Sequence, residues 1–305
     1  MDKVFAWAQR ATPRPAFTSA ANGAQYRVVV VPALSDNYQF LVINNASSEA
    51  VAVDCCDAPS ILHQLQTERA ILVAVLTTHF HADHSGGNEA LAASQPGLAI
   101  FAGAADARRT PSCTNVIDDG DAVQLAGLRF KAMHTPGHTK GHTCFFLDDG
   151  VAQSVFTGDC IFVCGCGRFF EGSPVTMWAS LGKLASLPAE TRVFCGHEYT
   201  EGNLRFAVSL DPDDAELRAK LAEVEEQRKA GLATVPSTIA DELRFNPFLR
   251  ISEEGIARSL GFADASQPME VLATMRRKKD TFTPLGSLIT YALDLKAYAG
   301  GKAAP

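Results

Sequence analysis

Three histidines and one aspartate lie within six residues directly after an apolar segment, and this cluster constrains the fold more than any other feature. The apolar segment is 71–78, whose continuous hydrophobicity predicts a strand buried on both faces. The residues that follow it are the types that bind zinc and related divalent ions: His79, His81, Asp83 and His84. Without a metal, these polar groups would be costly at the end of a buried strand. We therefore predict a metal site at one edge of a sheet.

Three further candidate ligands follow other predicted strands. His138 comes after the strand around Phe130, Asp159 follows the strand 154–157, and His197 follows the strand 192–195. Loops at one edge of a rigid sheet hold their side chains at fixed separations, so we expect these groups to converge. A glycine directly precedes each of the three candidates, which fits a backbone bend that turns the next side chain toward a common point.

Three other polar residues near these motifs are expected to support the site without binding metal. Asp54 follows the predicted strand 51–53 and His142 lies close to His138, and both are expected to orient a ligand. His134 is expected to be structural.

The distribution of apolar segments predicts an α/β protein. From Tyr26 to residue 198, many short apolar segments alternate with turn residues and few helical patterns, which is typical of a covered sandwich rather than a doubly wound sheet. Helical patterns dominate after residue 198, including a charged helix that we expect Asp211 to cap and Lys229 to end. We expect a flexible N-terminal extension (1–25), a sandwich domain (26–198) and a smaller helical domain (199–305).

Composition excludes several classes of partner. The 27 Lys and Arg residues against 34 Asp and Glu give a net charge of −7, and there is no long basic tract, so we expect no nucleic-acid partner. No run of about 18 apolar residues occurs, so we expect no membrane span. The eight cysteines form no CxxC pair, which indicates reduced thiols and a cytoplasmic location. Residues 1–25, with Arg10 and Arg14 and few acids, leave a mitochondrial location as the alternative.

The seven candidate ligands resemble the dinuclear site of the metallo-β-lactamase superfamily. A wider set of motifs resembles one branch of it, the hydroxyacylglutathione hydrolases (glyoxalase II). These motifs run from about residue 27 to residue 282, and the segments 195–200 (CGHEYT) and 275–280 (MRRKKD) narrow the resemblance to this branch. The resemblance implies an αββα sandwich with a smaller C-terminal helical domain.

The resemblance also implies a role for each ligand. One metal would be held by His79, His81 and His138, and the second by Asp83, His84 and His197, with Asp159 bridging both. Two divalent ions per chain are therefore expected, with zinc first and iron or manganese as alternatives, because these ligands accept all three. A hydroxide between the ions would be the nucleophile, and Asp83 and Asp159 would be the catalytic carboxylates.

The implied reaction is hydrolysis of S-(2-hydroxyacyl)glutathione to glutathione and a 2-hydroxy acid. The first expected substrate is S-D-lactoylglutathione, which would give D-lactate in the second step of methylglyoxal detoxification. The residues expected to bind this thioester are Arg168, Phe170, His197, Tyr199, Arg276 and Lys279. Arg276 and Lys279 are spaced i, i+3 on a predicted helix, so we expect them to face one target together.

One of these residues departs from the family pattern. Phe170 stands where the family commonly has a tyrosine that donates a hydrogen bond to glutathione. Loss of one neutral hydrogen bond costs about 0.5–1.5 kcal/mol, or a factor of about 2–13 in affinity. Such a loss weakens binding without abolishing it, and a somewhat different thiol cofactor is the alternative.

Two other functions fit parts of the same pattern. A mononuclear iron persulfide dioxygenase would use His79, His138 and Asp159 as a two-histidine, one-carboxylate set and would not need Asp83 or His84. A metal-dependent binding module without catalysis is the second alternative. We expect a monomer or weak oligomer, and the sequence assigns no role to the segment after Phe282.

Overall fold

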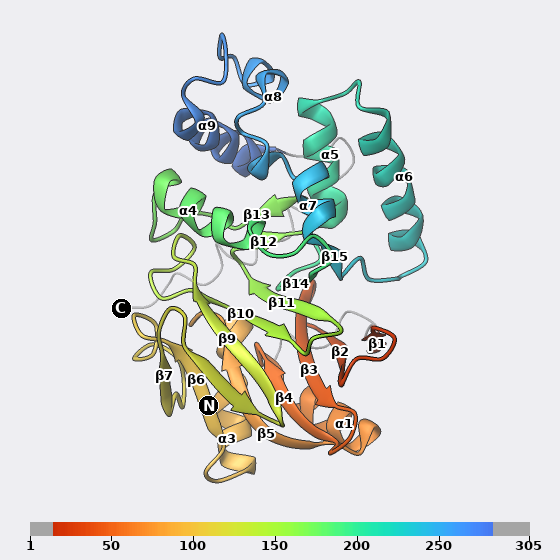
Figure 1. Ribbon diagram of the computed structural model, residues 1–305, viewed down its shortest axis with the longest axis vertical. Coiled ribbons are helices and arrows are strands. Elements are labelled where there is room, and N and C mark those ends of the chain that lie inside the picture. The colour runs from red at the N-terminus through yellow and green to blue at the C-terminus, as the bar shows by residue number, and fades with distance from the viewer. Residues whose placement is uncertain (1–14, 283–305) are drawn as a thin grey trace, which may run out of the picture.

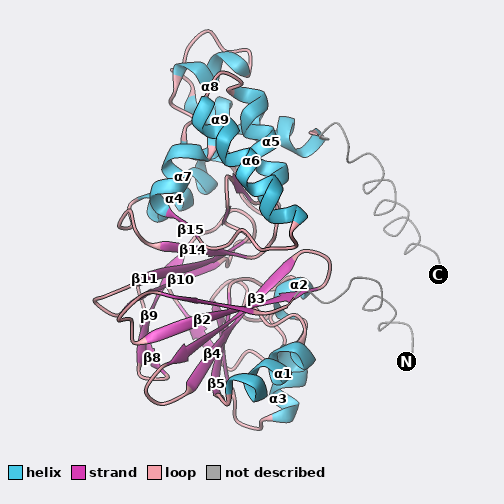
Figure 2. Cartoon of the chain, turned by 90° about the vertical axis from the view of Figure 1, so that its right-hand side faces the viewer, coloured by secondary structure: helices cyan, strands magenta, loops and turns pink. Residues whose placement is uncertain are grey.

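Two β-sheets pack face to face in the computed structural model, which describes residues 15–282 (Figures 1 and 2). The first sheet has the strand order β1-β2-β3-β4-β5-β6-β7, antiparallel from β1 to β4 and parallel from β4 to β7. Its strands are β1 (Phe17–Ala20), β2 (Tyr26–Ala33), β3 (Asn37–Asn44), β4 (Glu49–Val53), β5 (Ile71–Thr77), β6 (Ala99–Gly103) and β7 (Asn115–Ile117).

The second sheet has the order β15-β14-β11-β10-β9-β8, and only its β11–β14 pair is parallel among the described residues. Its strands are β8 (Ala122–Leu125), β9 (Leu128–His134), β10 (Thr143–Asp148), β11 (Gln153–Gly158), β14 (Arg192–Cys195) and β15 (Ser237–Thr238). A separate hairpin is formed by β12 (Ile161–Phe162) and β13 (Gly165–Cys166).

Helices cover both outer faces of the sandwich (Figure 2). On the first sheet lie α1 (Ala58–Glu68) and α3 (Asn88–Ser94), and α2 (Ala82–Ser85) follows β5. On the second sheet lies α4 (Pro174–Ala185), with the C-terminal helices beyond it. These are α5 (Thr200–Leu210), α6 (Ala215–Lys229), α7 (Ile239–Phe245), the 3₁₀-helix η1 (Pro247–Leu249), α8 (Glu254–Ser259) and α9 (Pro268–Thr281).

The alternation of side chains along β2 explains the layers. Val28 and Val30 point into the core between the sheets, whereas Val29 and Val31 pack under α1 and α3. All four are buried because both faces of the sheet are covered. The rings of Phe40, Phe156 and Phe194 meet in the core between the sheets, with centroids 5.3–5.6 Å apart. This arrangement confirms the predicted αββα sandwich with a C-terminal helical region.

Three details differ from the sequence-based expectations. Residues Phe17–Ala20, expected to be part of a flexible extension, form β1 and pair with β2, because the sheet supplies hydrogen bonds to this short segment. β15, expected in the helical domain, pairs with β14 and so joins the second sheet. The N-cap of α6 is Asp214, whose side chain accepts from Leu217 N, and not Asp211. Our expectations for residues 1–14 and 283–305 lie outside the described residues.

None of the helices in residues 15–282 combines the length and the apolar character needed to cross a membrane.

Candidate metal centre

The seven predicted ligands meet at the end of the sandwich where β5, β9, β11 and β14 finish. The loop after β5 and helix α2 supply the first four ligands. His138 comes from the loop after β9, while Asp159 and His197 follow β11 and β14. Ligand atoms from all seven fall into three overlapping groups, and within each group the atoms lie within 4.8 Å of one another.

The first set of ligands consists of three imidazoles. His81 Nδ1 lies 3.0 Å from His79 Nε2 and 3.0 Å from His138 Nε2. Ligands of a tetrahedral zinc ion, bound at about 2.0–2.1 Å, are separated by about 3.3 Å. The three nitrogens are therefore spaced as the ligands of one ion.

The second set consists of two imidazoles and a carboxylate. His84 Nε2 lies 3.2 Å from His197 Nε2. Asp83 Oδ2 lies 3.4 Å from His197 Nε2 and 3.8 Å from His84 Nε2. These atoms also have the spacing of ligands around one ion, as expected for the second metal.

Asp159 faces both sets with different oxygens. Its Oδ1 lies 3.2 Å from His84 Nε2 and 3.5 Å from His197 Nε2, whereas its Oδ2 lies 3.4 Å from His138 Nε2. Oδ1 is buried and accepts no well-formed hydrogen bond from the described residues. A buried carboxylate oxygen without a donor is costly, and a bound cation would satisfy it. The residues present therefore fit a pair of divalent ions.

Four histidines each have a polar partner for Nδ1, the ring nitrogen that does not face the other candidate ligands. His84 Nδ1 lies 3.0 Å from Asp54 Oδ2, and His197 Nδ1 lies 2.8 Å from Asp36 Oδ1. His138 Nδ1 donates to the carbonyl oxygen of Arg168 (3.0 Å), and His79 Nδ1 lies 3.1 Å from Thr78 Oγ1. Such partners fix the ring orientation and leave Nε2 free to bind metal.

Two carboxylates, Asp54 and Asp36, hold the rings of the second set of ligands. The structure places Asp54 against His84, where it also accepts from Thr78 N (2.7 Å) and Thr78 Oγ1 (2.8 Å). The role of Asp36 was missed: the segment 35–37 indicates a turn between two strands and belongs to a motif of the family resemblance, but no local pattern links it to a histidine 161 residues away.

Two glycines before the ligands allow close approach of the chain. Gly158, before Asp159, has φ +44°, and a Cβ there would clash with Thr78 Oγ1. A Cβ at Gly196, before His197, would lie 2.5 Å from His84 Cε1 and 2.7 Å from Asp159 Oδ1. Side chains at either position would therefore push the ligands apart.

The histidines divide into two electrostatic groups. Burial lowers the pKa of His79 well below its usual range, and it also lowers the pKa of His138. Burial acts in the same direction on His197, but Asp159 and Asp36 outweigh it and raise the pKa of His197 to about 9. His84 behaves likewise, because Asp159 and Asp54 raise its pKa despite burial. The carboxylates thus favour positive charge at the second set.

Burial opposes ionisation of both carboxylate ligands, but the histidines outweigh it. His197 and His84 hold the pKa of Asp159 well below its usual range, and they do the same for Asp83. Both groups are therefore anionic at neutral pH and available as metal ligands.

A cavity of about 420 Å³ lies between the loop after β13 and helix α9. Its lining residues are Arg168, Phe169, Phe170, Gly172, Pro174, Ala273, Arg276, Arg277 and Asp280. The ring of Phe170 is 60% exposed, and its centroid lies 5.0 Å from that of His138 and 5.9 Å from that of His81. The cavity therefore adjoins the first set of ligands.

Three of the predicted substrate residues line this cavity and three do not. Arg276 lines it, donating to the carbonyl oxygen of Cys166 (2.8 Å) and to Asp280 Oδ1 (3.0 Å). Lys279 does not line it; its Nζ donates to the carbonyl oxygen of Gly202 (2.9 Å), and burial lowers its pKa to about 7. Arg276 and Lys279 therefore do not meet in one cavity, because each is held by a different carbonyl.

Tyr199 lies on the second set of ligands. Its ring stacks on His197 with centroids 4.7 Å apart and planes 4° apart, and it does not line the cavity. Two histidines support neighbouring loops: His142 Nε2 accepts from Asp159 N (3.2 Å), and His134 Nε2 donates to the carbonyl oxygen of Lys140 (2.8 Å). His142 thus holds the backbone of a ligand, and His134 closes a loop.

Comparisons with known proteins agree with this geometry. Residues 46–197 match the family model "Metallo-beta-lactamase superfamily", and residues 198–282 match "Hydroxyacylglutathione hydrolase C-terminus". A hydroxyacylglutathione hydrolase of Maricaulis maris is 44% identical over 252 residues, covering 82% of this chain and 96% of that protein. The Arabidopsis thaliana protein named hydroxyacylglutathione hydrolase cytoplasmic is 40% identical over 258 residues, covering 83% and 98%.

A solved structure is also similar to this chain. The crystal structure of TTHA1623 in a di-iron-bound form is similar to this chain with a TM-score of 0.52 and 28% identity, covering 73% of this chain and 99% of that one. The two family models together span both parts of the fold, and the relatives match over more than four fifths of the chain. The chain therefore belongs to the hydroxyacylglutathione hydrolase family of the metallo-beta-lactamase superfamily.

Proposed function

We propose that the protein hydrolyses S-(2-hydroxyacyl)glutathione thioesters, with S-D-lactoylglutathione as the main substrate and glutathione and D-lactate as products. This reaction would be the second step of methylglyoxal detoxification. The observation that carries the proposal is the convergence of two ligand sets on Asp159, beside a cavity lined by Arg168 and Arg276. The relatives named hydroxyacylglutathione hydrolase support it.

We propose two divalent ions per chain, zinc first, with iron or manganese as alternatives. His79, His81 and His138 would hold one ion, Asp83, His84 and His197 the other, and Asp159 would contact both. When bound, such ions supply Lewis acidity toward a carbonyl oxygen and lower the pKa of water enough to give hydroxide at neutral pH.

The charges that line the cavity suit the thiol half of the substrate. Glutathione in a thioester carries two carboxylates and one ammonium, a net charge of about −1. Arg168 Nε lies 3.3 Å from Asp280 Oδ1, which also accepts from Arg276. Asp280 lies between these two guanidinium groups and neutralises one of them. Because Arg277 also lines the cavity, two positive charges remain for the carboxylates of glutathione.

Two other side chains would complete substrate binding. Phe170 would cover the peptide chain beside His138, and Tyr199 would offer its hydroxyl next to His197. Lys279, which the sequence predicts to bind the substrate, donates to the carbonyl oxygen of Gly202 and does not line the cavity, so it would not touch the substrate in the described geometry. The leaving thiolate is stable as an anion, so no separate general acid is needed.

Turnover of S-D-lactoylglutathione, measured together with metal content per chain, tests the proposal. We expect hydrolysis that disappears after exhaustive chelation and returns when Zn²⁺ is added. A lactoyl thioester of a simple thiol should be a much poorer substrate, because it cannot use Arg168 and Arg276. Full activity after chelation, or equal rates with both thioesters, would overturn the assignment.

The alternative functions make different predictions in the same experiment. A mononuclear iron persulfide dioxygenase would contain one iron per chain and consume oxygen, and it would leave the set of Asp83, His84 and His197 without a purpose. A binding module would bind metal but not cleave the thioester. The complete second ligand set favours the hydrolase.

We further propose a cytoplasmic protein that acts as a monomer or weak oligomer. The relative named hydroxyacylglutathione hydrolase cytoplasmic supports the location. A mitochondrial location, suggested by the composition of residues 1–25, is the alternative. Fractionation of cells that express the tagged protein would distinguish the two, and sedimentation would give the oligomeric state.

A further inference from the structure

Glu198 directly follows the ligand His197, and both of its carboxylate oxygens accept hydrogen bonds. Its side chain is only 4% exposed. Oε2 accepts from the hydroxyl of Tyr38 (2.6 Å) and from Thr234 N (2.9 Å), and Oε1 accepts from Thr234 Oγ1 (2.8 Å). Arg228 Nη1 lies 3.4 Å from Oε2. A buried carboxylate with this many donors fixes the positions of the segments that supply them.

The first of these segments, 36–38, runs beside the segment 196–198. Tyr38 N donates to the carbonyl oxygen of Gly196 (2.8 Å), and Glu198 N donates to the carbonyl oxygen of Asp36 (2.9 Å). The bond from the Tyr38 hydroxyl to Glu198 adds a side-chain link to these backbone links. Glu198 therefore helps to keep the two segments in register.

The segment 36–38 in turn positions two metal ligands. Asp36 Oδ1 lies 2.8 Å from His197 Nδ1 and so sets the orientation of that ring. Asn37 Nδ2 donates to the carbonyl oxygen of Asp83 (2.9 Å). A shift of this segment would displace His197 and Asp83 together, and both belong to the second ligand set.

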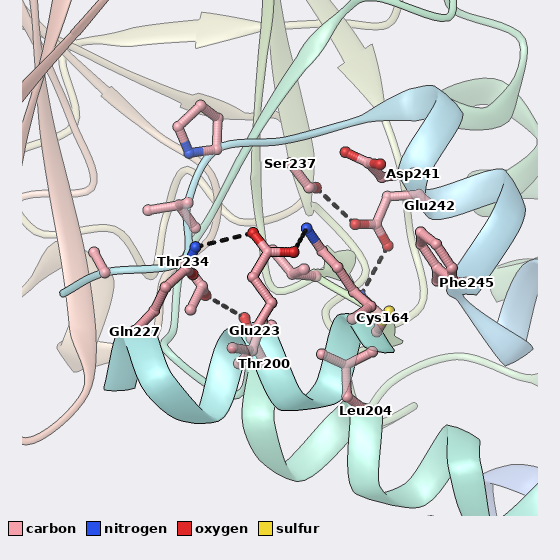
Figure 3. A pocket seen from close by; sticks show the side chains of 16 residues that line it. Cys164, Thr200, Leu204, Glu223, Gln227, Thr234, Ser237, Asp241, Glu242 and Phe245 are labelled. Atoms are coloured by element: carbon pink, nitrogen blue, oxygen red, sulfur yellow. Dashed lines mark hydrogen bonds and ion pairs between the residues drawn. The ribbon is translucent and has the colours of Figure 1, made fainter. Parts of the chain in front are cut away.

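The other donors to Glu198 come from the C-terminal helical region. Arg228 lies in the last turn of α6, and Thr234 lies between α6 and β15. Thr234 also lines a cavity of about 280 Å³ next to Thr200 (Figure 3). Beside this cavity, the backbone N and the Oγ1 of Thr234 both donate hydrogen bonds to Glu198.

We propose that Glu198 is a positioning residue that makes the affinity of the second metal ion depend on the helical region. It acts through the segment 36–38 and His197, and it does not touch the metal itself. The proposal rests on the metal centre of the proposed function, but not on the identity of the thioester.

Metal affinity of Glu198→Ala and Glu198→Gln, measured by chelator competition with Zn²⁺, tests this role. We expect Glu198→Ala to bind one of its two ions about 10–100-fold more weakly than the wild type, as is usual when a residue that supports a ligand is lost. Glu198→Gln should lose less, because its amide oxygen still accepts one hydrogen bond. With the thioester, kcat should fall while KM changes little.

Glu242→Ala is the matched control. Glu242 is fully buried and accepts from Cys164 N (2.9 Å), Ser237 Oγ (2.6 Å) and Asn246 Nδ2 (2.9 Å), so its loss costs stability in the same region. We expect both alanine variants to lower the melting temperature of the metal-free protein, and only Glu198→Ala to weaken one ion.

Several outcomes would overturn the role of Glu198: unchanged affinity for both ions in Glu198→Ala, an equal loss in Glu242→Ala, or a wild type that binds only one ion. If Glu198→Ala does not fold, Tyr38→Phe removes a single hydroxyl and should weaken the same ion to a smaller extent; an unchanged affinity there would overturn it too. A wild type that binds two ions but does not cleave the thioester refutes the proposed function alone.

Discussion

Arg109 binds Glu171 through two parallel bonds, Nη1 to Oε1 at 2.6 Å and Nη2 to Oε2 at 2.9 Å. Arg109 also donates to the buried Asp106 (2.9 Å), and its guanidinium lies 3.7 Å from the centroid of the Phe80 ring. Glu171 follows Phe170 in the loop that lines the cavity. The pair therefore fixes this loop to the segment that carries the first candidate ligands, His79 and His81.

Replacing Arg109 with lysine should raise KM for the glutathione thioester and leave the metal content unchanged. Lysine keeps the charge but cannot form the two parallel bonds. Because the pair is partly exposed, we expect an increase of only about 1.5- to 5-fold, and a smaller one at high salt. Steady-state kinetics at two salt concentrations measure this, with the exposed neighbour changed as Arg108→Lys as the control. A fall in metal content would contradict the assigned role.

Asp159→Asn should remove metal and activity together. The amide offers one oxygen and no charge, so the two ligand sets lose the carboxylate of Asp159 that faces both of them. We expect less than about one ion per chain and activity below about 1% of the wild type. Metal analysis of the purified variant measures the number of ions per chain. Asp148→Asn serves as the control, because Asp148 ends β10 and pairs with Gln153 at the start of β11, far along the strand from Asp159. Two ions retained in Asp159→Asn would show that the carboxylate does not hold them.

Phe170→Tyr should tighten substrate binding. The exposed ring of Phe170 lines the cavity, so we expect a hydroxyl on it to donate a hydrogen bond to the peptide part of glutathione. One added neutral hydrogen bond corresponds to a KM about 2- to 13-fold lower, with kcat nearly constant. A lower KM with a glutathione thioester but not with a thioester of a simple thiol would support this. An unchanged KM with both would instead favour a different thiol partner.

Glu242 should make the protein less stable as the pH rises from about 4.5 to about 7. Burial raises the pKa of Glu242 to about 7, outweighing the hydrogen bonds from Ser237 and Asn246. Between the unfolded and folded pKa values the native state binds the extra proton, so stability is present at low pH and is lost as pH rises through 7. Denaturant titrations at several pH values, compared with Glu242→Gln, measure this contribution. Parallel pH profiles for the two proteins would contradict it.

The convergence of the seven candidate ligands could be predicted from the sequence because each of them directly follows an apolar strand or its turn. His79 and Asp159 are examples, since their strands are continuous and their ligand types are unusual at such places. The partners that orient the ligands were harder to find. Asp36 and His197 are 161 residues apart in the chain, and no local pattern joins them.

Short elements and distant side-chain pairs escaped prediction for physical reasons. β15 has two residues, and its strand character comes from pairing with β14 rather than from its own sequence. Arg276 and Lys279 have the right spacing to face one target, but different carbonyl acceptors separate them. The bond between Arg109 and Glu171 depends on how two loops pack, which periodicity does not encode.

The pairing of β15 with β14 has a consequence for how the molecule can be divided. A chain cut after residue 198 would leave β14 as an unprotected outer strand, directly beside the segment that carries His197. An uncovered strand of this kind invites association with other chains. We therefore expect a chain cut at the matched family boundary at residue 198 to associate with other copies more readily than the whole chain does.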